Sequence, residues 1–388
     1  MIGKLFYYFL GLLDEQIRLR VIQQGSGNML SRKERVKLVR SQLEKEWHNK
    51  WWSFMMEHKS KLDWYEISRN PNIKMNDINE NPNKPWKWDY ISMNPNITMK
   101  DILENPDKPW DWYKISYNPN ITLTDILETP DNPWEWDYIS RNPNITMKDI
   151  LENPDKPWDW FWISNNPNIT LTDILETPDN QWNWYGISCN PNITIAFINA
   201  NPDKPWNWYN ISCNPNITMK DIKENSDNPW SWKGISSNSN ITMKDILENP
   251  DKPWAWDGIS QNTTITMDYI KETPDKPWNW YWLSSNPNIT MKDIKENPDK
   301  PWDWDEISSN SNITMKDILE NPDETWDWGS ISKNPFTRDK QEYQLKQYRM
   351  HLASYRIQQN WHRIRSNPYH PVGQKKLELE YDREFGRI

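Results

Sequence analysis

The sequence has few of the residues that usually build phosphate loops, metal centres and disulfides. It contains 10 glycines, 2 cysteines and 5 histidines in 388 residues. There is no glycine-rich phosphate-binding motif, and no histidine has the spacing of a metal site or a catalytic triad. We therefore expect a protein that is not an enzyme and that binds no cofactor or metal.

Long hydrophobic runs are also missing. One uncharged apolar stretch, Leu5 to Leu13, has nine residues, whereas a membrane-spanning helix needs about 20. It follows Lys4 as the apolar part of a signal peptide would, but Asp14 and Glu15 come next instead of a small-residue cleavage site. We expect a buried or dimerising helix in a protein that is not secreted; a membrane or export role is the alternative.

Aliphatic residues are scarce as well, which by itself would favour disorder, but tryptophan takes their place. The chain has 29 tryptophans, and a buried aromatic side chain covers about 150–250 Å². The first Trp of a Trp-x-Trp pair recurs every 24 residues, and the second Trp adds one earlier copy, Trp64. A fixed period in the twenties is typical of a stacked repeat array. The first Trp stands at 86, 110, 134, 158, 182, 206, 230, 254, 278, 302 and 326.

The second half of each unit predicts a short helix. In the unit that starts at Trp110, Thr122 is a candidate N-cap and Asp125 can complete a capping box. Ile121 and Ile126 can form a hydrophobic staple around that cap. The helix should end before Pro130, because proline disfavours helix in the residue that precedes it.

The first half of the unit predicts another helix, starting near residues 107–109. With the first Trp as position 0, the nearly constant residues are Trp at +2, Ile at +5, Ser at +6 and Pro at +9, which share one helical face. Alternation with a period of two is absent, and two prolines per unit would interrupt a β-ladder. The sequence therefore predicts an all-α protein, an α-solenoid of about eleven two-helix repeats. Eleven layers spaced by about 8–10 Å would form a body on the order of 100 Å long, whose curvature the sequence does not determine.

The array divides the chain into three predicted domains. These are an N-terminal helical cap at 1–60, the Trp-repeat solenoid at 61–337 and a basic C-terminal helical cap at 338–388. Caps are expected because the end repeats of a solenoid would otherwise expose an apolar face. Helices outside the array are expected at about 3–24, 31–58, 338–365 and 374–385. Residues 357–365 loosely resemble a calmodulin-binding IQ element, but we favour an amphipathic capping helix.

Charge is unevenly distributed along the chain. Residues 61–337 carry 24 Lys and Arg against 43 Asp and Glu, whereas both terminal segments are basic. Because contacts to phosphates need cations, we expect no nucleic-acid binding along the array.

Positions +3, +4 and +7 vary from unit to unit and lie opposite the constant face. Variation on one face of a rigid array is what a surface that binds protein partners would show; a solvated face that drifted after duplication is the alternative. We expect Trp at +2 to lie in the core. Trp at 0 should pack back onto the preceding turn or form a partly exposed aromatic stripe. The variable residues are Tyr113, Lys114 and Tyr117; Asp137, Tyr138 and Arg141; Phe161, Trp162 and Asn165; Tyr185, Gly186 and Cys189; Tyr209, Asn210 and Cys213; and Tyr281, Trp282 and Ser285.

Three further patterns have structural explanations that we prefer. Asn-Ile-Thr, a glycosylation acceptor pattern, occurs nine times, but the turn and the helix cap account for it. The repeated capping carboxylates, such as Asp125, look like cation ligands, but caps about 10 Å apart cannot share one ion. Cys189 and Cys213 occupy equivalent positions in neighbouring units, too far apart for a disulfide, which predicts reduced thiols in a reducing compartment.

The unit Asn-Pro-Asn-Ile-Thr-Met-Lys-Asp-Ile-Leu-Glu-Asn-Pro-Asp-Lys-Pro-Trp-Asp-Trp resembles the tandem Trp-repeat proteins of giant DNA viruses, mimivirus-like and iridovirus-like. The segments 354–358, 367–368 and 381–385 are similar to the ending of such proteins, so that the resemblance covers about residues 64–388. It implies a virus-encoded protein made in the host cytoplasm or packaged in the virion. It implies no activity and no site residues.

Together these patterns favour a non-enzymatic scaffold that binds protein partners, host proteins among them, through the variable face of the solenoid. A structural component of the virion or virus factory that self-assembles through its caps is one alternative. A binder of small ligands or glycans through an aromatic stripe is another.

Overall fold

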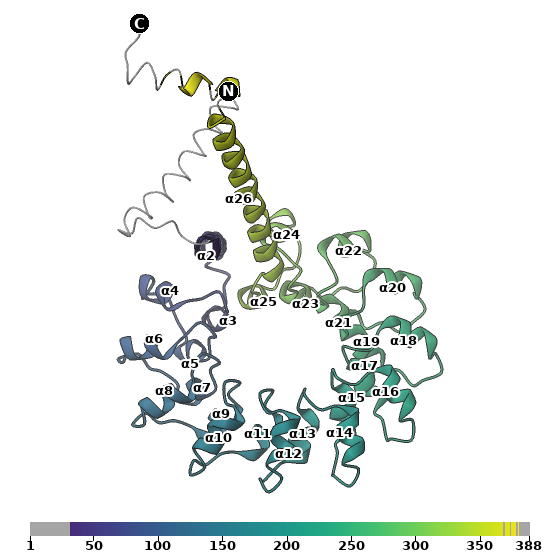
Figure 1. Ribbon diagram of the computed structural model, residues 1–388. Helices are drawn as coiled ribbons and strands as arrows, with labels where there is room; N and C mark the ends of the chain where they lie inside the picture. Colours follow the sequence, from purple (N-terminus) through teal and green to yellow (C-terminus); the bar gives the residue numbers. More distant parts are fainter. Residues whose placement is uncertain (1–31, 368, 373, 378, 380–388) are drawn as a thin grey trace. The chain divides into compact units, whose positions relative to one another are not determined.

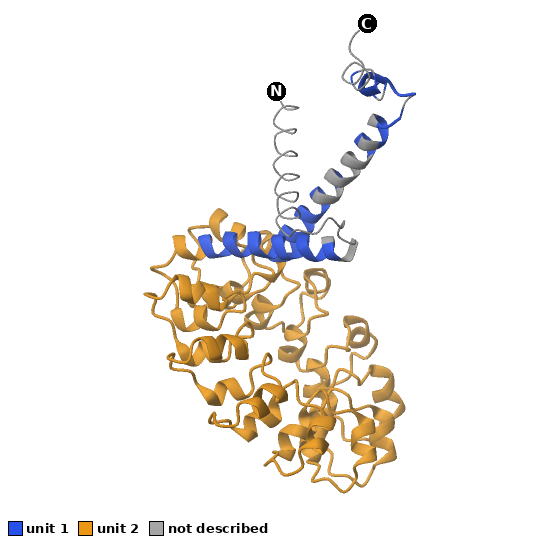
Figure 2. Cartoon of the chain, turned by 60° about the vertical axis from the view of Figure 1, so that its left-hand side comes forward, with its two compact units in different colours: residues 1–53, 340–388 blue, residues 54–339 orange. Residues whose placement is uncertain are grey.

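The computed structural model describes residues 32–367, 369–372, 374–377 and 379. The helix expected at 3–24, including Leu5 to Leu13, lies outside these residues, as do most of the helix expected at 374–385 and most side chains of the IQ-like segment. All regular secondary structure in the described part is helical. The chain forms two compact units, unit 1 with residues 1–53 and 340–388, and unit 2 with residues 54–339 (Figure 2).

Unit 1 contains most of two long helices, α2 (Arg32–Glu57) and α26 (Thr337–Arg365). They confirm the helices expected at 31–58 and 338–365. Lys340 Nζ lies 2.5 Å from one carboxylate oxygen of Glu44, and Gln344 donates to the other oxygen at 2.9 Å. Lys340 also lies 5.3 Å from the centre of the Trp47 ring. The two segments that the sequence assigns to opposite ends of the array therefore contact each other.

Unit 2 contains the repeats, each with one odd-numbered and one even-numbered helix, except the last repeat, whose short helix α25 is followed by the long helix α26. The odd-numbered helices begin at the second Trp of a unit, and the even-numbered helices begin directly after the capping Thr or its equivalent. The odd-numbered helices are α3 (Trp64–Arg69), α5 (Trp88–Ser92), α7 (Trp112–Ser116), α9 (Trp136–Arg141), α11 (Trp160–Asn165), α13 (Trp184–Cys189), α15 (Trp208–Cys213), α17 (Trp232–Ser237), α19 (Trp256–Gln261), α21 (Trp280–Ser285), α23 (Trp304–Ser309) and α25 (Trp328–Lys333). The even-numbered helices are α4 (Met75–Glu80), α6 (Met99–Glu104), α8 (Leu123–Glu128), α10 (Met147–Glu152), α12 (Leu171–Glu176), α14 (Ile195–Ala200), α16 (Met219–Glu224), α18 (Met243–Glu248), α20 (Met267–Glu272), α22 (Met291–Glu296) and α24 (Met315–Glu320).

The even-numbered helices form as the sequence predicts. Thr122 accepts a hydrogen bond from Asp125 N while the Asp125 carboxylate accepts from Thr122 N at 2.8 Å, which completes the capping box. The helix ends at Glu128, before Pro130. In α14, Phe197 replaces the aspartate, and Thr194 Oγ1 alone accepts from the backbone, at 3.4 Å. In α20 the side chain of Thr266 makes no cap hydrogen bond, yet the helix forms. The capping box therefore accompanies most helices of this layer but is not required for each of them.

The odd-numbered helices begin later than the sequence analysis placed them. The helix expected to start near 107–109 begins at Trp112, because Asp111 is its N-cap and accepts from Lys114 N at 3.2 Å. Pro109 lies in the preceding turn instead of the first helical turn. The helix is five residues long, so that Pro119 at +9 lies beyond it, in the turn to the next helix.

Isoleucine forms most of the core, and tryptophan lies at its margin. Ile115, Ile121 and Ile126 are 0–2% exposed, and burying such a side chain contributes about 1.5–3 kcal/mol. The prediction that Trp at +2 is a core residue is wrong in degree, since Trp112 is only half-buried. Its ring packs edge to face against Trp134 of the next unit, with ring centroids 5.0 Å apart. The same pair recurs at eleven junctions, with centroids 4.8–5.2 Å apart.

The first Trp of each unit packs back onto the preceding turn, one of the two expected arrangements. Trp110 Nε1 donates to the carbonyl of Asn105, the C-cap of α6, at 2.9 Å. This bond gives the indole N–H a partner where the ring is partly buried, as such a group requires. The turn between the two helices is thereby fixed to the next Trp pair.

Buried serine and asparagine side chains join one unit to the next. Ser116 at +6 donates to Trp112 O and accepts from Glu135 N of the following unit at 3.0 Å. Asn118 at +8 donates to Ser92 O and Asn94 O of the preceding unit at 2.9 and 3.0 Å. Both residues are at most 1% exposed. Because a buried polar group without a partner is costly, these bonds fix how each unit is placed on its neighbour.

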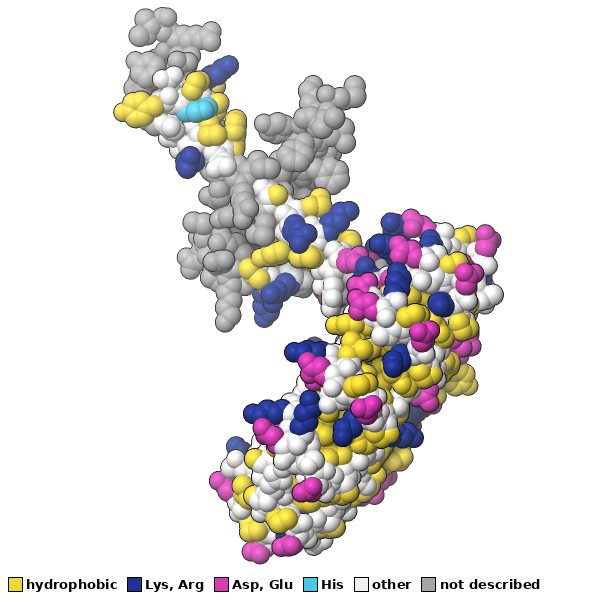
Figure 3. Space-filling model, turned by 90° about the vertical axis from the view of Figure 1, so that its right-hand side faces the viewer, with side chains coloured by type: hydrophobic (Ala, Val, Ile, Leu, Met, Phe, Trp, Pro, Cys, Tyr) yellow, Lys and Arg dark blue, Asp and Glu magenta, His cyan; other side chains and the backbone are white. Residues whose placement is uncertain are grey.

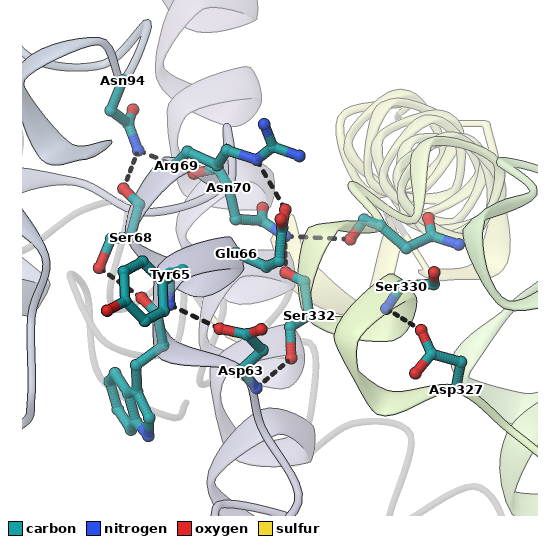
Figure 4. A network of polar contacts seen from close by, with 12 residues as sticks. Asp63, Tyr65, Glu66, Ser68, Arg69, Asn70, Asn94, Asp327, Ser330 and Ser332 are labelled. Carbon is teal, nitrogen blue, oxygen red and sulfur yellow. Dashed lines mark hydrogen bonds and ion pairs between the residues drawn. The ribbon is translucent and has the colours of Figure 1, made fainter. Parts of the chain in front are cut away.

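Unit 2 is a closed ring, so the array has no free ends of the kind for which the sequence analysis expected caps. The odd-numbered helices form its inner layer and the even-numbered helices its outer layer (Figure 1). Asp63 N donates to Ser332 Oγ at 3.0 Å, and Asn70 Nδ2 donates to Ser332 O at 2.7 Å and Asn334 O at 3.1 Å (Figure 4). The bond to the serine hydroxyl and the bond to the asparagine carbonyl recur at every other junction. The bond to the serine carbonyl recurs at all of them except those of Asn166, Asn214 and Asn262. We call this contact between α25 and α3 the closing junction.

The chain leaves the repeat pattern at Phe336. The turn Asn-Pro-Asn-Ile is shortened there by one residue, and Phe336 takes the buried place of Ile with a positive φ of 49°. A non-glycine residue in this region costs about 1–3 kcal/mol, which full burial and packing against Phe54 at 5.9 Å offset. Trp328 is the second Trp of the last unit, and no first Trp follows it along the chain. Phe54 and His58 stack on its ring instead.

Candidate interaction surface

The variable positions of the inner layer form an exposed band of aromatic side chains. Four of the expected residues, Tyr113, Tyr185, Tyr209 and Tyr281, all at +3, are 45–51% exposed. Two more of the expected residues are exposed, Asp137 at +3 and Arg141 at +7. The others are half-buried: Phe161 at +3, and Lys114, Tyr117, Tyr138, Trp162, Asn165 and Trp282 at +4 or +7. Apart from Gly186, which is buried, the expected residues thus lie at the surface of one layer.

Side chains of this band contact one another across unit boundaries in α7 to α13. Arg141 lies 4.5 Å from the ring centre of Trp162 and 5.9 Å from that of Tyr117. Tyr138 contacts Tyr113, with ring centroids 3.7 Å apart. In the next units Phe161 stacks on Tyr185 with centroids 6.1 Å apart. A cation between two rings is held by the negative faces of both, so the band is partly ordered before any partner binds.

The band extends into the first two units, where the sequence analysis named no residue. Lys87 lies 4.3 Å from the ring centre of Tyr65, and Tyr65 packs edge to face on Tyr90 at 5.6 Å. Lys114 lies 4.6 Å from the ring centre of Tyr90 and 3.4 Å from Asp89 Oδ2. Tyr65 and Asp89 stand at +3 and Tyr90 at +4, so the same offsets could have identified them.

Glycine at +4 interrupts the band and lets inner helices approach closely. A Cβ on Gly186 would lie 2.7 Å from Phe161 O and 2.9 Å from Ser164 Cβ. A Cβ on Gly234 or Gly258 would come as close to the unit before it, at 2.8 and 2.6 Å. Units with Tyr or Trp at +4 need more room between helices. The residue at +4 therefore sets the local spacing as well as the local surface.

The titratable groups of the band are perturbed by their immediate neighbours. A hydrogen bond to Glu306, together with the charge of that carboxylate, raises the pKa of Tyr281. Burial raises the pKa of both the Cys189 and Cys213 thiols. Both thiols are free and half-buried. Raised pKa values keep them protonated and weakly nucleophilic near neutral pH.

The remaining polar patterns are used by the fold. Asn144 of an Asn-Ile-Thr pattern donates to Pro119 O and Ile121 O of the preceding unit. The Asp149 carboxylate accepts from Thr146 N and Oγ1 at 2.8 and 2.7 Å. Among the described residues, no group of three or more His, Cys, Asp or Glu side chains is placed to hold a metal ion. Within the same part of the chain, no helix has the length and apolar character needed to cross a membrane.

One cavity of about 330 Å³ lies between α20 and the turns that follow it. Met267 and Ile270 form part of its lining, together with Lys271 and Lys300. Lys271 Nζ is 3.6 Å from Glu296 Oε2, and Lys300 lies over the Trp280 ring at 5.4 Å. Because these cations already have partners, the cavity offers no convergent set of unused polar groups of the kind that ligand sites have.

Comparison of the chain with known protein families, curated proteins and solved structures finds no match. The fold and the surfaces described above are therefore the basis for a functional assignment.

Proposed function

We propose that this protein is a non-enzymatic repeat scaffold whose inner layer binds a protein partner. The observation that supports this best is the band of tyrosine, tryptophan, arginine and lysine side chains on the inner helices, whose members contact one another from α3 to α13. Tyr, Trp and Arg are the residues most often found at the energetic centres of protein interfaces. Tyr113 and Tyr185, both about half exposed, retain apolar area that a partner can bury.

A protein partner suits the band better than a nucleic acid does. Residues 61–337 carry 24 basic against 43 acidic residues, and a phosphate backbone would be repelled by that excess. On the side of unit 2 that carries α18, α20 and α22, Figure 3 shows acidic and basic side chains intermixed, with hydrophobic side chains among them. Within the band itself, Asp89, Lys114 and Arg141 lie beside the aromatic side chains. A mixed polar surface around exposed aromatic side chains is the usual composition of a protein interface.

The test compares an inner-layer variant with an outer-layer control in a quantitative pull-down. The inner variant carries Tyr113→Ala, Tyr185→Ala and Tyr209→Ala, which truncate side chains 46–51% exposed. The control carries Leu103→Ala, Leu127→Ala and Leu175→Ala, which truncate outer-layer side chains 40–62% exposed. A partner held by the band should be lost by the inner variant, with at least a tenfold weaker affinity for the purified partner, and kept by the control. If no protein distinguishes the two variants, the proposal is wrong.

Self-assembly is a second candidate function, favoured by the outer layer. Leu103, Leu127, Leu151 and Leu175 occupy the same position of four consecutive outer helices and are 40–62% exposed. A row of exposed leucines is an apolar strip that a second copy could bury. Light scattering as a function of concentration tests this, since substitution of the four leucines by Lys should abolish any oligomer. A monomer at all concentrations would exclude it.

The resemblance to giant-virus repeat proteins extends the proposal to location. We propose that the scaffold is virus-encoded and acts in the host cytoplasm or within the virion, where its partners include host proteins. Proteomics of purified virions and proximity labelling during infection distinguish the two places. Detection of the protein only in the culture medium would contradict both.

A further inference from the structure

Lysine side chains of the chain itself lie over the second Trp of most units. The lysine stands two residues before the first Trp of the next unit, and its ammonium group is 4.9–5.9 Å from the ring centre. The negative face of an indole attracts a cation at this distance. Each such Trp also packs edge to face with the next Trp. The seven lysine–tryptophan pairs are Lys84–Trp64, Lys108–Trp88, Lys156–Trp136, Lys204–Trp184, Lys252–Trp232, Lys276–Trp256 and Lys300–Trp280.

Glu324 replaces this lysine at the junction between α23 and α25. The backbone is unchanged there, since Trp326 N donates to Glu324 O at 2.9 Å, as Trp302 N does to Lys300 O at 2.8 Å. Trp304 and Trp326 keep the edge-to-face arrangement, with centroids 5.1 Å apart and an interplanar angle of 81°. The exposed side chain of Glu324 therefore extends from the backbone position that lysine has at seven other junctions.

The surroundings of Glu324 strengthen the attraction for a cation. Residues 303–327 contain eight acidic residues and one lysine. That lysine, Lys316, pairs with Glu320 at 3.6 Å. Asp327 caps α25 by accepting from Ser330 N at 2.8 Å. Because Glu324 extends from the backbone position that lysine has at seven other junctions, its carboxylate is within reach of the Trp304 face. A cation bound there would be attracted by both the ring and the carboxylate.

We propose that Trp304, Trp326 and Glu324 form a binding site for an alkylammonium group. Trp304 supplies the ring face that lysine occupies at seven other junctions, and Glu324 supplies the opposite charge. The group is either the end of a lysine side chain, methylated or not, or a free quaternary ammonium ion. At Asn132, Asn180 and Asn228 a neutral residue replaces the lysine, so those junctions lack the carboxylate. This site is independent of the inner-layer band proposed above.

The test uses tetramethylammonium and ligand-observed NMR on the full chain. The background variant carries Asn132→Lys, Asn180→Lys and Asn228→Lys, which gives the three neutral junctions the residue found at the other seven. In this background we expect saturation transfer to the methyl protons with a Kd on the order of 1–10 mM, because one exposed cation–π contact is weak. Adding Glu324→Lys should weaken binding at least fivefold, because the new lysine occupies the Trp304 face. Lys300→Glu should instead create a second site and about double the bound ligand.

Two further measurements are needed. One identifies the source of the ammonium group, and the other checks that every variant is folded. A peptide with one trimethyllysine that binds at least tenfold more tightly than tetramethylammonium assigns the site to a lysine side chain; equal affinity assigns it to the free ion. Circular dichroism should be the same for all variants, because each substitution copies another unit. Equal binding by Glu324 and Glu324→Lys proteins would overturn the proposal, as would no binding to either.

Discussion

Asn238 offers the most direct test of how the ring is held together. It lies in mid-array, is fully buried, and donates from Nδ2 to Ser212 O, Asn214 O and Ile217 O at 2.8–3.1 Å. Its Oδ1 accepts from Asn240 N at 2.9 Å. Asn238→Ala removes every side-chain bond of this residue while leaving its own backbone in place.

The expected loss follows from the acceptors left behind. The amide has two N–H groups shared among three carbonyl oxygens, and a buried polar group that loses its partner costs about 1–3 kcal/mol. Two such losses sum to about 2–6 kcal/mol, and because relaxation lowers the cost we expect about 2–5 kcal/mol. The bond from Asn240 N adds little, because Asn240 is exposed and water can replace the acceptor.

Urea unfolding of the full chain, followed by circular dichroism and by tryptophan fluorescence, measures the loss. Ser239→Ala is the matched control, since Ser239 is the exposed neighbour and surface substitutions usually change stability by less than about 0.5 kcal/mol. If the two probes do not coincide, amide hydrogen exchange in α15 and α17 gives the local value. A loss below about 1 kcal/mol for Asn238→Ala would refute the reasoning that buried amides hold the units together.

Three further predictions address closure, helix spacing and the tryptophan pairs. Spin labels at Tyr65 and Gly329 should report one short distance in the closed ring. An added longer distance should appear after Asn70→Ala, which removes two bonds of the closing junction and leaves the bond from Asp63 N. A single long distance without that substitution would show an open array. Gly186→Ala should cost about 1–3 kcal/mol by overpacking, because its Cβ would lie 2.7 Å from a backbone oxygen. Gly329→Ala should be neutral or stabilising by up to about 1 kcal/mol, since its Cβ would meet only the Asp327 carboxylate, at 3.3 Å. If urea unfolding gave the same loss of stability for Gly186→Ala and Gly329→Ala, this account of helix spacing would be contradicted. Trp208→Ala should cost about 2 kcal/mol, less than the 3–5 kcal/mol typical of fully buried aromatic residues, because the ring is half-buried; a loss near 5 kcal/mol would place it in the core.

Some of the candidate site could be predicted from the sequence. The offsets +3, +4 and +7 were enough to find Tyr113, Tyr185 and Arg141, because exposure on a short helix follows directly from its periodicity. The contacts within the band could not be found in this way. Arg141 lies between Tyr117 of one unit and Trp162 of another, and only the spacing of packed helices brings those rings to opposite sides of one guanidinium group.

What the sequence by itself determined is local. The capping box of Thr122 and Asp125, the end of the helix before Pro130 and the period of 24 residues all depend on interactions within a few residues, so they can be read along the chain. The all-helical class follows from them.

Tertiary structure decided what the repeated residues are bonded to and how the array ends. Nothing in the constant Ser116 and Asn118 reveals that their partners lie 19 to 26 residues away, in adjacent units. Ring closure depends on small rotations added over the whole array, which no single unit contains. Asp63 and Asn70 meet Ser332 only because those rotations bring α3 back to α25.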